Sequence, residues 1–200
     1  MKKIFLIAVA TLMATTSVKA QNGYDDTKHE VAISYGIDAN SQILDGLENV
    51  GGIMFGGKFK NESYIGPIAA EYFYHLKNWL GIGGVFVYGH STEDAYLRGN
   101  DDKVGEHKNT YITVMPAAKF DWFRRKNIGL YSKLALGVTF RNEKIDSTNP
   151  DVQDESDSSV HFNWQASLIG IEAGSPKVRA FGELGFGEQG IFVAGVRFKF

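Results

Sequence analysis

The chain has 200 residues, 22% of them charged, and its formal net charge at pH 7 is −2. This is the length of one domain, so a second domain is not required. The mildly acidic balance gives no reason to expect a nucleic-acid partner. The sequence contains no cysteine, which excludes disulfides, a lipid-modified cysteine and thiol chemistry.

The N-terminus has the pattern of a secretory signal peptide over residues 1–20. Lys2 and Lys3 precede an apolar run, and Val18 and Ala20 supply the small residues of a cleavage site. The run is too short to cross a bilayer as a helix. We therefore expect cleavage after Ala20. Cleavage removes three lysines and no acid, which takes the formal charge from −2 to −2 − 3 = −5.

The mature chain, residues 21–200, has no stretch apolar enough for a transmembrane helix, so a membrane location would require a closed barrel of strands. It divides into segments of roughly ten residues with alternating character, separated alternately by short turns and long polar loops. This pattern predicts an all-β fold, an eight-stranded antiparallel up-and-down transmembrane β-barrel. The expected strands are residues 29–38, 63–76, 80–91, 109–123, 128–143, 160–173, 178–187 and 190–200, and the long outward loops are 39–62, 92–108 and 144–159.

Within the expected strands, apolar residues share one face and charged residues share the other. In 128–143, for example, Leu134 and Leu136 alternate with Lys133. Glycines blur the alternation of 80–91, where we place Ile82, Phe86 and Tyr88 outward although the reverse remains open. Charges buried together must pair, so an eight-stranded lumen is expected to be filled by a salt-bridge network. Its expected members are Glu71, Lys119, Asp121, Lys133, Arg141, Glu143, Arg179, Glu183 and Arg197, with Lys199 on the same face.

The chain ends on an aromatic strand: Phe200 and Phe198 alternate with charged residues, and Gly195 stands five residues before the end. This ending resembles the C-terminal assembly signal of bacterial outer-membrane proteins, which the barrel-insertion machinery reads. The mature chain resembles the small porin-like barrel family abundant in Bacteroidota, with OmpA- and OmpX-type barrels as more distant analogues. The resemblance implies a monomer in the outer membrane of a Gram-negative cell. Its partners would be outer-membrane lipids, lipopolysaccharide and, during biogenesis, periplasmic chaperones and the assembly machinery.

One histidine is a weak candidate for catalysis, because some small outer-membrane barrels modify lipids. His161 shares the inward face of its strand with polar residues near the outer rim, where Arg141 and Glu143 could approach. A satisfied polar network explains these residues equally well. We therefore expect no catalytic residue and no enzyme.

The third long loop is rich in carboxylates, namely Asp151, Asp154, Glu155 and Asp157. The run lacks the spacing and the closing glutamate of a calcium loop, so we interpret it as a solvated acidic loop without a metal. No cofactor motif is present. In the first loop, apolar residues over 41–55 have roughly helical spacing after Ser41, which favours a short amphipathic helix over the mouth; a hairpin extension is the alternative.

These observations favour a non-enzymatic outer-membrane barrel that contributes to envelope integrity or surface interactions through its extracellular loops. No extracellular ligand is identified. The alternatives are a lipid-modifying enzyme, a narrow porin-like channel, and a soluble lipocalin-like barrel. The last of these would need an apolar interior and a polar exterior.

Overall fold

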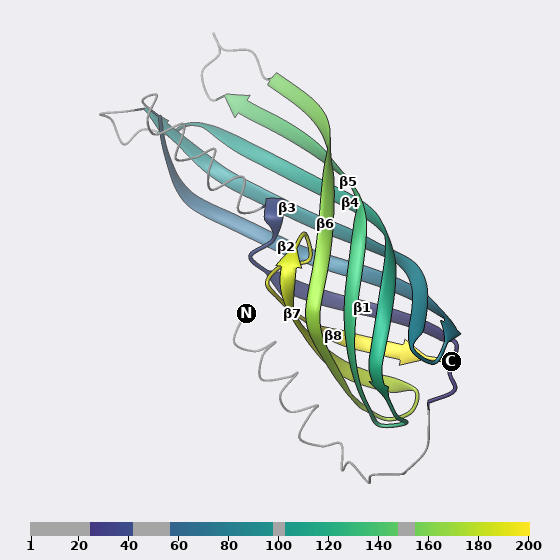
Figure 1. Cartoon of the computed structure of the whole chain (residues 1–200). Coiled ribbons are helices and arrows are strands. Elements are labelled where there is room, and N and C mark those ends of the chain that lie inside the picture. The colour runs from purple at the N-terminus through teal and green to yellow at the C-terminus, as the bar shows by residue number, and fades with distance from the viewer. Residues whose placement is uncertain (1–24, 42–56, 98–102, 148–154) are drawn as a thin grey trace.

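The computed structural model describes residues 25–41, 57–97, 103–147 and 155–200. Eight strands close into one antiparallel barrel in chain order, which confirms the predicted fold (Figure 1). They are β1 (His29–Ile37), β2 (Gly57–Lys77), β3 (Leu80–Leu97), β4 (Lys103–Arg124), β5 (Ile128–Ser147), β6 (Glu155–Gly174), β7 (Val178–Gly187) and β8 (Phe192–Lys199).

Several predicted features lie outside the described residues. These are the signal peptide over 1–20, nearly all of the first-loop segment 41–55, and two of the loop carboxylates, Asp151 and Asp154. Within the described ranges, no helix combines the length and the apolar character needed to cross a membrane.

The five middle strands are longer than predicted at the end opposite the short turns, which we call the long-loop end. Pairing of β2 with β3 continues out to Gly57 and Leu97, and pairing of β4 with β5 continues to Gly105 and Ser147. The expected loops 39–62, 92–108 and 144–159 were therefore too long. Their polarity marks the end of the apolar outer face, since backbone pairing continues beyond it. Figure 1 shows β2 to β6 rising well beyond β1, β7 and β8.

The two faces of the wall are sorted as the alternation predicts. Outward side chains are apolar and exposed, for example Phe162 at 67% and Trp122 at 63%, whereas inward Lys119 is 0% exposed. The uncertain strand, β3, follows the placement that we favour, with Ile82 and Phe86 outward. The outside of this barrel is therefore apolar and its inside holds the charges.

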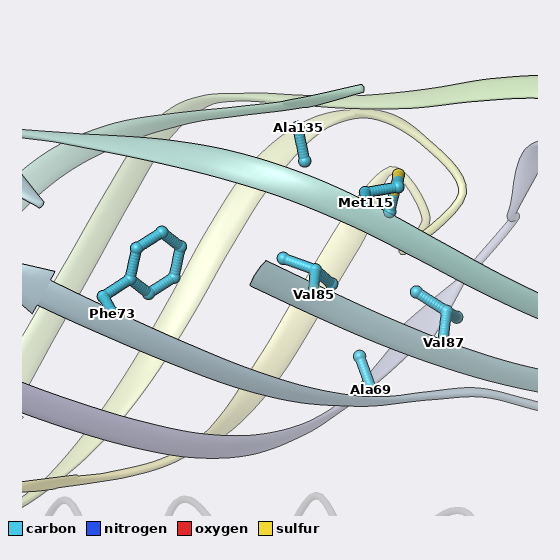
Figure 2. Packing of buried hydrophobic residues seen from close by; sticks show 6 residues of the cluster. All are labelled: Ala69, Phe73, Val85, Val87, Met115 and Ala135. Atoms are coloured by element: carbon cyan, nitrogen blue, oxygen red, sulfur yellow. The ribbon is translucent and has the colours of Figure 1, made fainter. Parts of the chain in front are cut away.

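One side of the lumen is nevertheless apolar, which the sequence did not reveal. Phe73, Val85, Val87 and Met115 project inward from β2, β3 and β4 and are at most 2% exposed (Figure 2). Two alanines, one from β2 and one from β5, complete this apolar wall. The charged residues adjoin this wall, since Glu71 faces inward on β2 between Ala69 and Phe73.

Removing Phe73 should destabilise the barrel by leaving a cavity in the apolar wall. We expect Phe73→Ala to lower the free energy of unfolding by about 3–5 kcal/mol. The measurement is urea unfolding in detergent micelles. Phe86→Ala, on the neighbouring strand but pointing outward, is the control and should have a clearly smaller effect. Equal losses at both positions would mean that Phe73 packs no more tightly than an outward side chain.

Candidate functional site

The candidate site is the network of buried charges in the lumen. Among the described residues it contains six carboxylates and six cations, none more than 8% exposed. The carboxylates are Asp25, Glu30, Glu71, Asp121, Glu172 and Glu183, and the cations are Lys119, Arg124, Lys133, Arg179, Arg197 and Lys199. The formal charges of these twelve side chains cancel. This balance is what burial of so many ions requires.

Glu172 of β6 is the centre of one half of the network. Its carboxylate lies 2.5 Å from Arg179 Nη1, 2.6 Å from Arg197 Nη1 and 3.3 Å from Lys119 Nζ. Lys199 also pairs with it. Four cations from β4, β7 and β8 thus converge on a single carboxylate.

The other half is built around Lys133 and Glu183. Lys133 Nζ lies 2.7 Å from Glu183 Oε2 and also pairs with Glu71. Tyr131 donates its hydroxyl to Glu183 at 2.7 Å. Arg197 joins the two halves: its Nη2 is 3.1 Å from Glu71, and its guanidinium lies 4.7 Å from the centre of the Tyr131 ring. Side chains from β2, β5, β7 and β8 are thereby held together across the lumen.

The short-turn end is closed by the segment that precedes β1. Asp25 Oδ2 lies 2.9 Å from Arg179 Nη2 and 2.9 Å from Lys199 Nζ. Burial would raise the pKa of Asp25, but Lys199, a hydrogen bond from Thr27 and Arg124 outweigh it and hold the pKa below its ordinary value. Asp25 therefore stabilises the fold above its unfolded pKa, and this contribution is lost as the pH falls through the lowered pKa.

The long-loop end is closed by the turn between β7 and β8. Gly187 and Gly190 have φ values of 133° and 107°, in the region that favours glycine. A Cβ at Gly190 would lie 2.3 Å from the carbonyl oxygen of Ile37, so only glycine allows this close approach to β1. The turn consequently folds into the mouth of the barrel, where Glu188 and Gln189 are 2% and 1% exposed.

Glu188 holds the start of the first loop across the mouth. It accepts hydrogen bonds from the Ser41 hydroxyl at 2.7 Å and from Asn163 Nδ2 at 2.7 Å. Thr113 donates a third at 3.1 Å. Burial raises the pKa of Glu188, because these hydrogen bonds offset only part of the desolvation. Below it, Gln189 Nε2 donates to Glu71 at 2.8 Å, so the mouth is connected to the charged network.

The structure places seven of the nine predicted network residues together and two apart. Arg141 and Glu143 lie nearer the long-loop end of β5, with Arg141 Nη2 3.6 Å from Glu143 Oε2. Glu143 also pairs with His107 at 2.6 Å, and is therefore engaged with a histidine other than His161. His161 faces inward beside Thr139, with its Nε2 buried.

Two network residues escape strict alternation because each follows a bulge. In β6 one extra residue leaves Leu168 and Ile169 both outward, so Glu172 turns inward. In β4 the register shift after Asp121 leaves Trp122 and Phe123 both outward, so Arg124 turns inward. A pair of consecutive apolar residues at each bulge was the available signal. Glu30 needed only the simple alternation of β1, whereas Asp25, Glu188 and Gln189 lie outside the strands and give no comparable signal.

The C-terminal residues lie at the short-turn end. Phe198 and Phe200 face outward, and the Phe200 ring is stacked on His29 with a centroid distance of 5.5 Å. A Cβ at Gly195 would lie 2.3 Å from the carbonyl oxygen of Ile33 and would also contact the Phe181 ring. Packing alone therefore requires glycine at this position.

No protein-family model matches the chain, and no curated protein matches its sequence. It is similar to the crystal structure of Ail, the attachment invasion locus protein of Yersinia pestis. That match has 17% identity and a TM-score of 0.49 and covers 87% of this chain and 99% of that one. A second structure shows Ail in complex with the heparin analogue sucrose octasulfate. It matches with 16% identity and a TM-score of 0.47 over the same shares. The fold assignment rests on the closed strand pairing of the chain itself.

Removing the charge of Glu172 should break the network at its centre. We expect Glu172→Gln to lower the free energy of unfolding by about 3–5 kcal/mol, because four cations lose their shared partner without leaving the interior. Urea unfolding in micelles measures the loss. Glu143→Gln is the control: its side chain is 28% exposed, and the expected loss is below about 1 kcal/mol. A Glu172 variant no weaker than this control would contradict the arrangement.

The raised pKa of Glu188 predicts a pH dependence of opposite sign to that of Asp25. A raised folded pKa means that the stabilising contribution is complete below the unfolded pKa and is lost as the pH rises through the folded one. We therefore expect the melting temperature of the wild type, relative to Glu188→Gln, to increase from neutral pH down to about pH 4. Groups that titrate equally in both proteins do not contribute to the difference between their melting temperatures. A difference in melting temperature that stays constant over this pH range would show that Glu188 does not titrate in this way.

Proposed function

We propose that this chain is an integral outer-membrane β-barrel protein of a Gram-negative bacterium, with a closed lumen and no enzymatic activity, that acts through the surfaces at its long-loop end. The observation that carries the proposal is the sorting of the wall, with apolar side chains exposed outward and charged side chains buried inward. Such an exterior is unfavourable in water and suited to lipid.

The height of the apolar belt supports the membrane assignment. On β5 it runs through alternate residues from Leu130 to Phe140, and on β4 from Ile112 to Trp122. Eleven residues of a tilted strand match the apolar band of outer-membrane barrels, which is about 25 Å tall. A soluble lipocalin-like barrel would require apolar side chains around its interior, where this chain has twelve ions in balance.

The filled interior argues against a channel. Asp25 closes the short-turn end, the network spans the middle, and the Glu188 turn closes the mouth. Conduction would require these paired ions to separate inside the barrel, which is costly because each would be left unpaired. We therefore propose that the network serves as structural filling and not as an ion path.

The long-loop end supports surface interactions. β1 pairs with β2 only as far as Ile68, and β7 pairs with β6 only from Gln165. Beyond these points the described pairings leave one backbone edge of β2 and one of β6 without a neighbouring strand. An extended segment of a partner can add to such an edge. We propose that the extended sheet and its loops provide the contact surface at the cell exterior.

The remaining assignments are proposals of the same kind. Residues 1–20 would direct export, Phe198 and Phe200 would present the assembly signal, and the mature barrel would be a monomer among outer-membrane lipids and lipopolysaccharide. A lipid-modifying activity at His161 has less support, because Glu143 pairs across the sheet with Asp157, four residues from His161, and is engaged with His107. Its test is whether His161→Ala abolishes any lipase or acyl-transfer activity in a correctly folded barrel.

The membrane assignment and the closed lumen can be tested together on washed outer membranes. We expect the protein in this fraction, with gel mobility that differs between boiled and unboiled samples, because a closed barrel resists detergent until heated. In planar bilayers the purified barrel should give no steady conductance. Recovery as a soluble periplasmic protein without a heat shift would overturn the membrane assignment. Steady conductance that changes in Glu183→Gln would instead support the narrow channel.

A further inference from the structure

The outer wall has a groove of about 500 Å³ where β4, β5 and β6 meet. Phe120 and Trp122 of β4 line one side, and Ala166, Leu168 and Ile169 of β6 line the other. Ser132 and Leu134 of β5 lie between them, with Ser132 opposite Phe120 and Leu134 opposite Ala166. Ser132 and Ala166 are the small outward side chains of the set, so the groove deepens at these two positions. The groove is open along the outer wall, so an occupant would lie against the strands and not inside a closed cavity.

The bulge of β6 creates this groove. Its extra residue sets Leu168 and Ile169 side by side on the outer face, where a regular strand would present only one. A bulge also frees a backbone carbonyl, and here the Ser132 hydroxyl donates to the Leu168 carbonyl oxygen at 2.7 Å. The distortion therefore leaves this carbonyl satisfied, as an apolar surrounding requires.

The polar groups near the floor of the groove are engaged on the lumen side. Lys133 pairs with Glu71 and Glu183, and Ser167 donates to Glu183 Oε2 at 2.5 Å. Lys133 and Ser167 are buried and point into the lumen, and the hydroxyl of the outward Ser132 is bonded to the Leu168 carbonyl oxygen. An occupant therefore meets carbon atoms and no charge, which selects a hydrocarbon chain over a headgroup or a peptide.

We propose that this groove binds one acyl chain of a phospholipid from the periplasmic leaflet. The inference rests on the proposed membrane location, which puts the groove inside the apolar belt. Trp122 and Phe123 are the last outward residues of β4 near the short turns, whereas Ile112 begins the belt at the other end. The groove therefore opens toward the leaflet on the short-turn side. Indole rings favour that interface.

Phospholipid retained by the purified protein tests the proposal. The full mature chain is extracted in a mild detergent, washed, and analysed for bound phospholipid by native mass spectrometry. We expect about one molecule per wild-type barrel, as a single groove allows. In Ala166→Phe it should fall by roughly fivefold or more, since the ring fills the space. Ala70→Phe, outward on β2 and away from the groove, is the matched control and should retain the wild-type amount.

A second measurement uses Trp122 as a reporter. In a protein with Trp79→Phe and Trp164→Phe, titration with a phospholipid brominated on its chains should quench Trp122 saturably, and adding Ala166→Phe should abolish the saturable part. If the barrels show the heat shift but retain no phospholipid, or retain it equally in all variants, acyl-chain binding in the groove is contradicted and the membrane assignment is not. A dimer that Ala166→Phe dissociates would instead assign the surface to a second copy. A wild type that is soluble and shows no heat shift overturns the membrane assignment and the groove with it.

Discussion

Buried ions inside a closed barrel have to balance, and this requirement ties the strands of this protein together. Glu172 can lie in the interior because Lys119, Arg179, Arg197 and Lys199 converge on it. Each of these cations also pairs with a second buried carboxylate, which is Glu30, Glu71 or Asp25. The network therefore links strands that are not hydrogen-bonded neighbours. The interior of the barrel acts as a core, as in a soluble domain. It combines the ion pairs with the apolar wall of β2 to β5, which Figure 2 shows.

The closure of both ends follows from the different lengths of the strands. β1, β7 and β8 are short, so the turn between β7 and β8 reaches into the mouth, where it contacts the network through Gln189. At the opposite end Asp25 enters the interior from the segment before β1. With the lumen occupied throughout, the described features available to a partner are the outer wall and the extension of β2 to β6. The proposed surface function follows from this geometry.

The alternation of the sequence was sufficient for the fold and for most of the network, because successive side chains of a regular strand point to opposite faces of the barrel wall. It failed where the strand is irregular. Arg124 and Glu172 follow bulges, so their parity is reversed, and the paired apolar residues that mark each bulge could have revealed this. It also failed outside the strands, since nothing local indicates that Glu188 turns inward. The loops were overestimated because polarity reports the surroundings of a strand and not its end.

The bulge of β6 affects both faces of the wall at once. By adding one residue it turns Glu172 into the lumen, where the network needs its charge, and the same residue sets Leu168 and Ile169 together on the outside. The groove is thus a geometric consequence of the arrangement that places Glu172. A variant without the extra residue would restore the alternation and close the groove, but it would also direct Glu172 outward into the apolar surroundings. The inward placement of Glu172 and the outward pair of Leu168 and Ile169 therefore depend on one backbone irregularity.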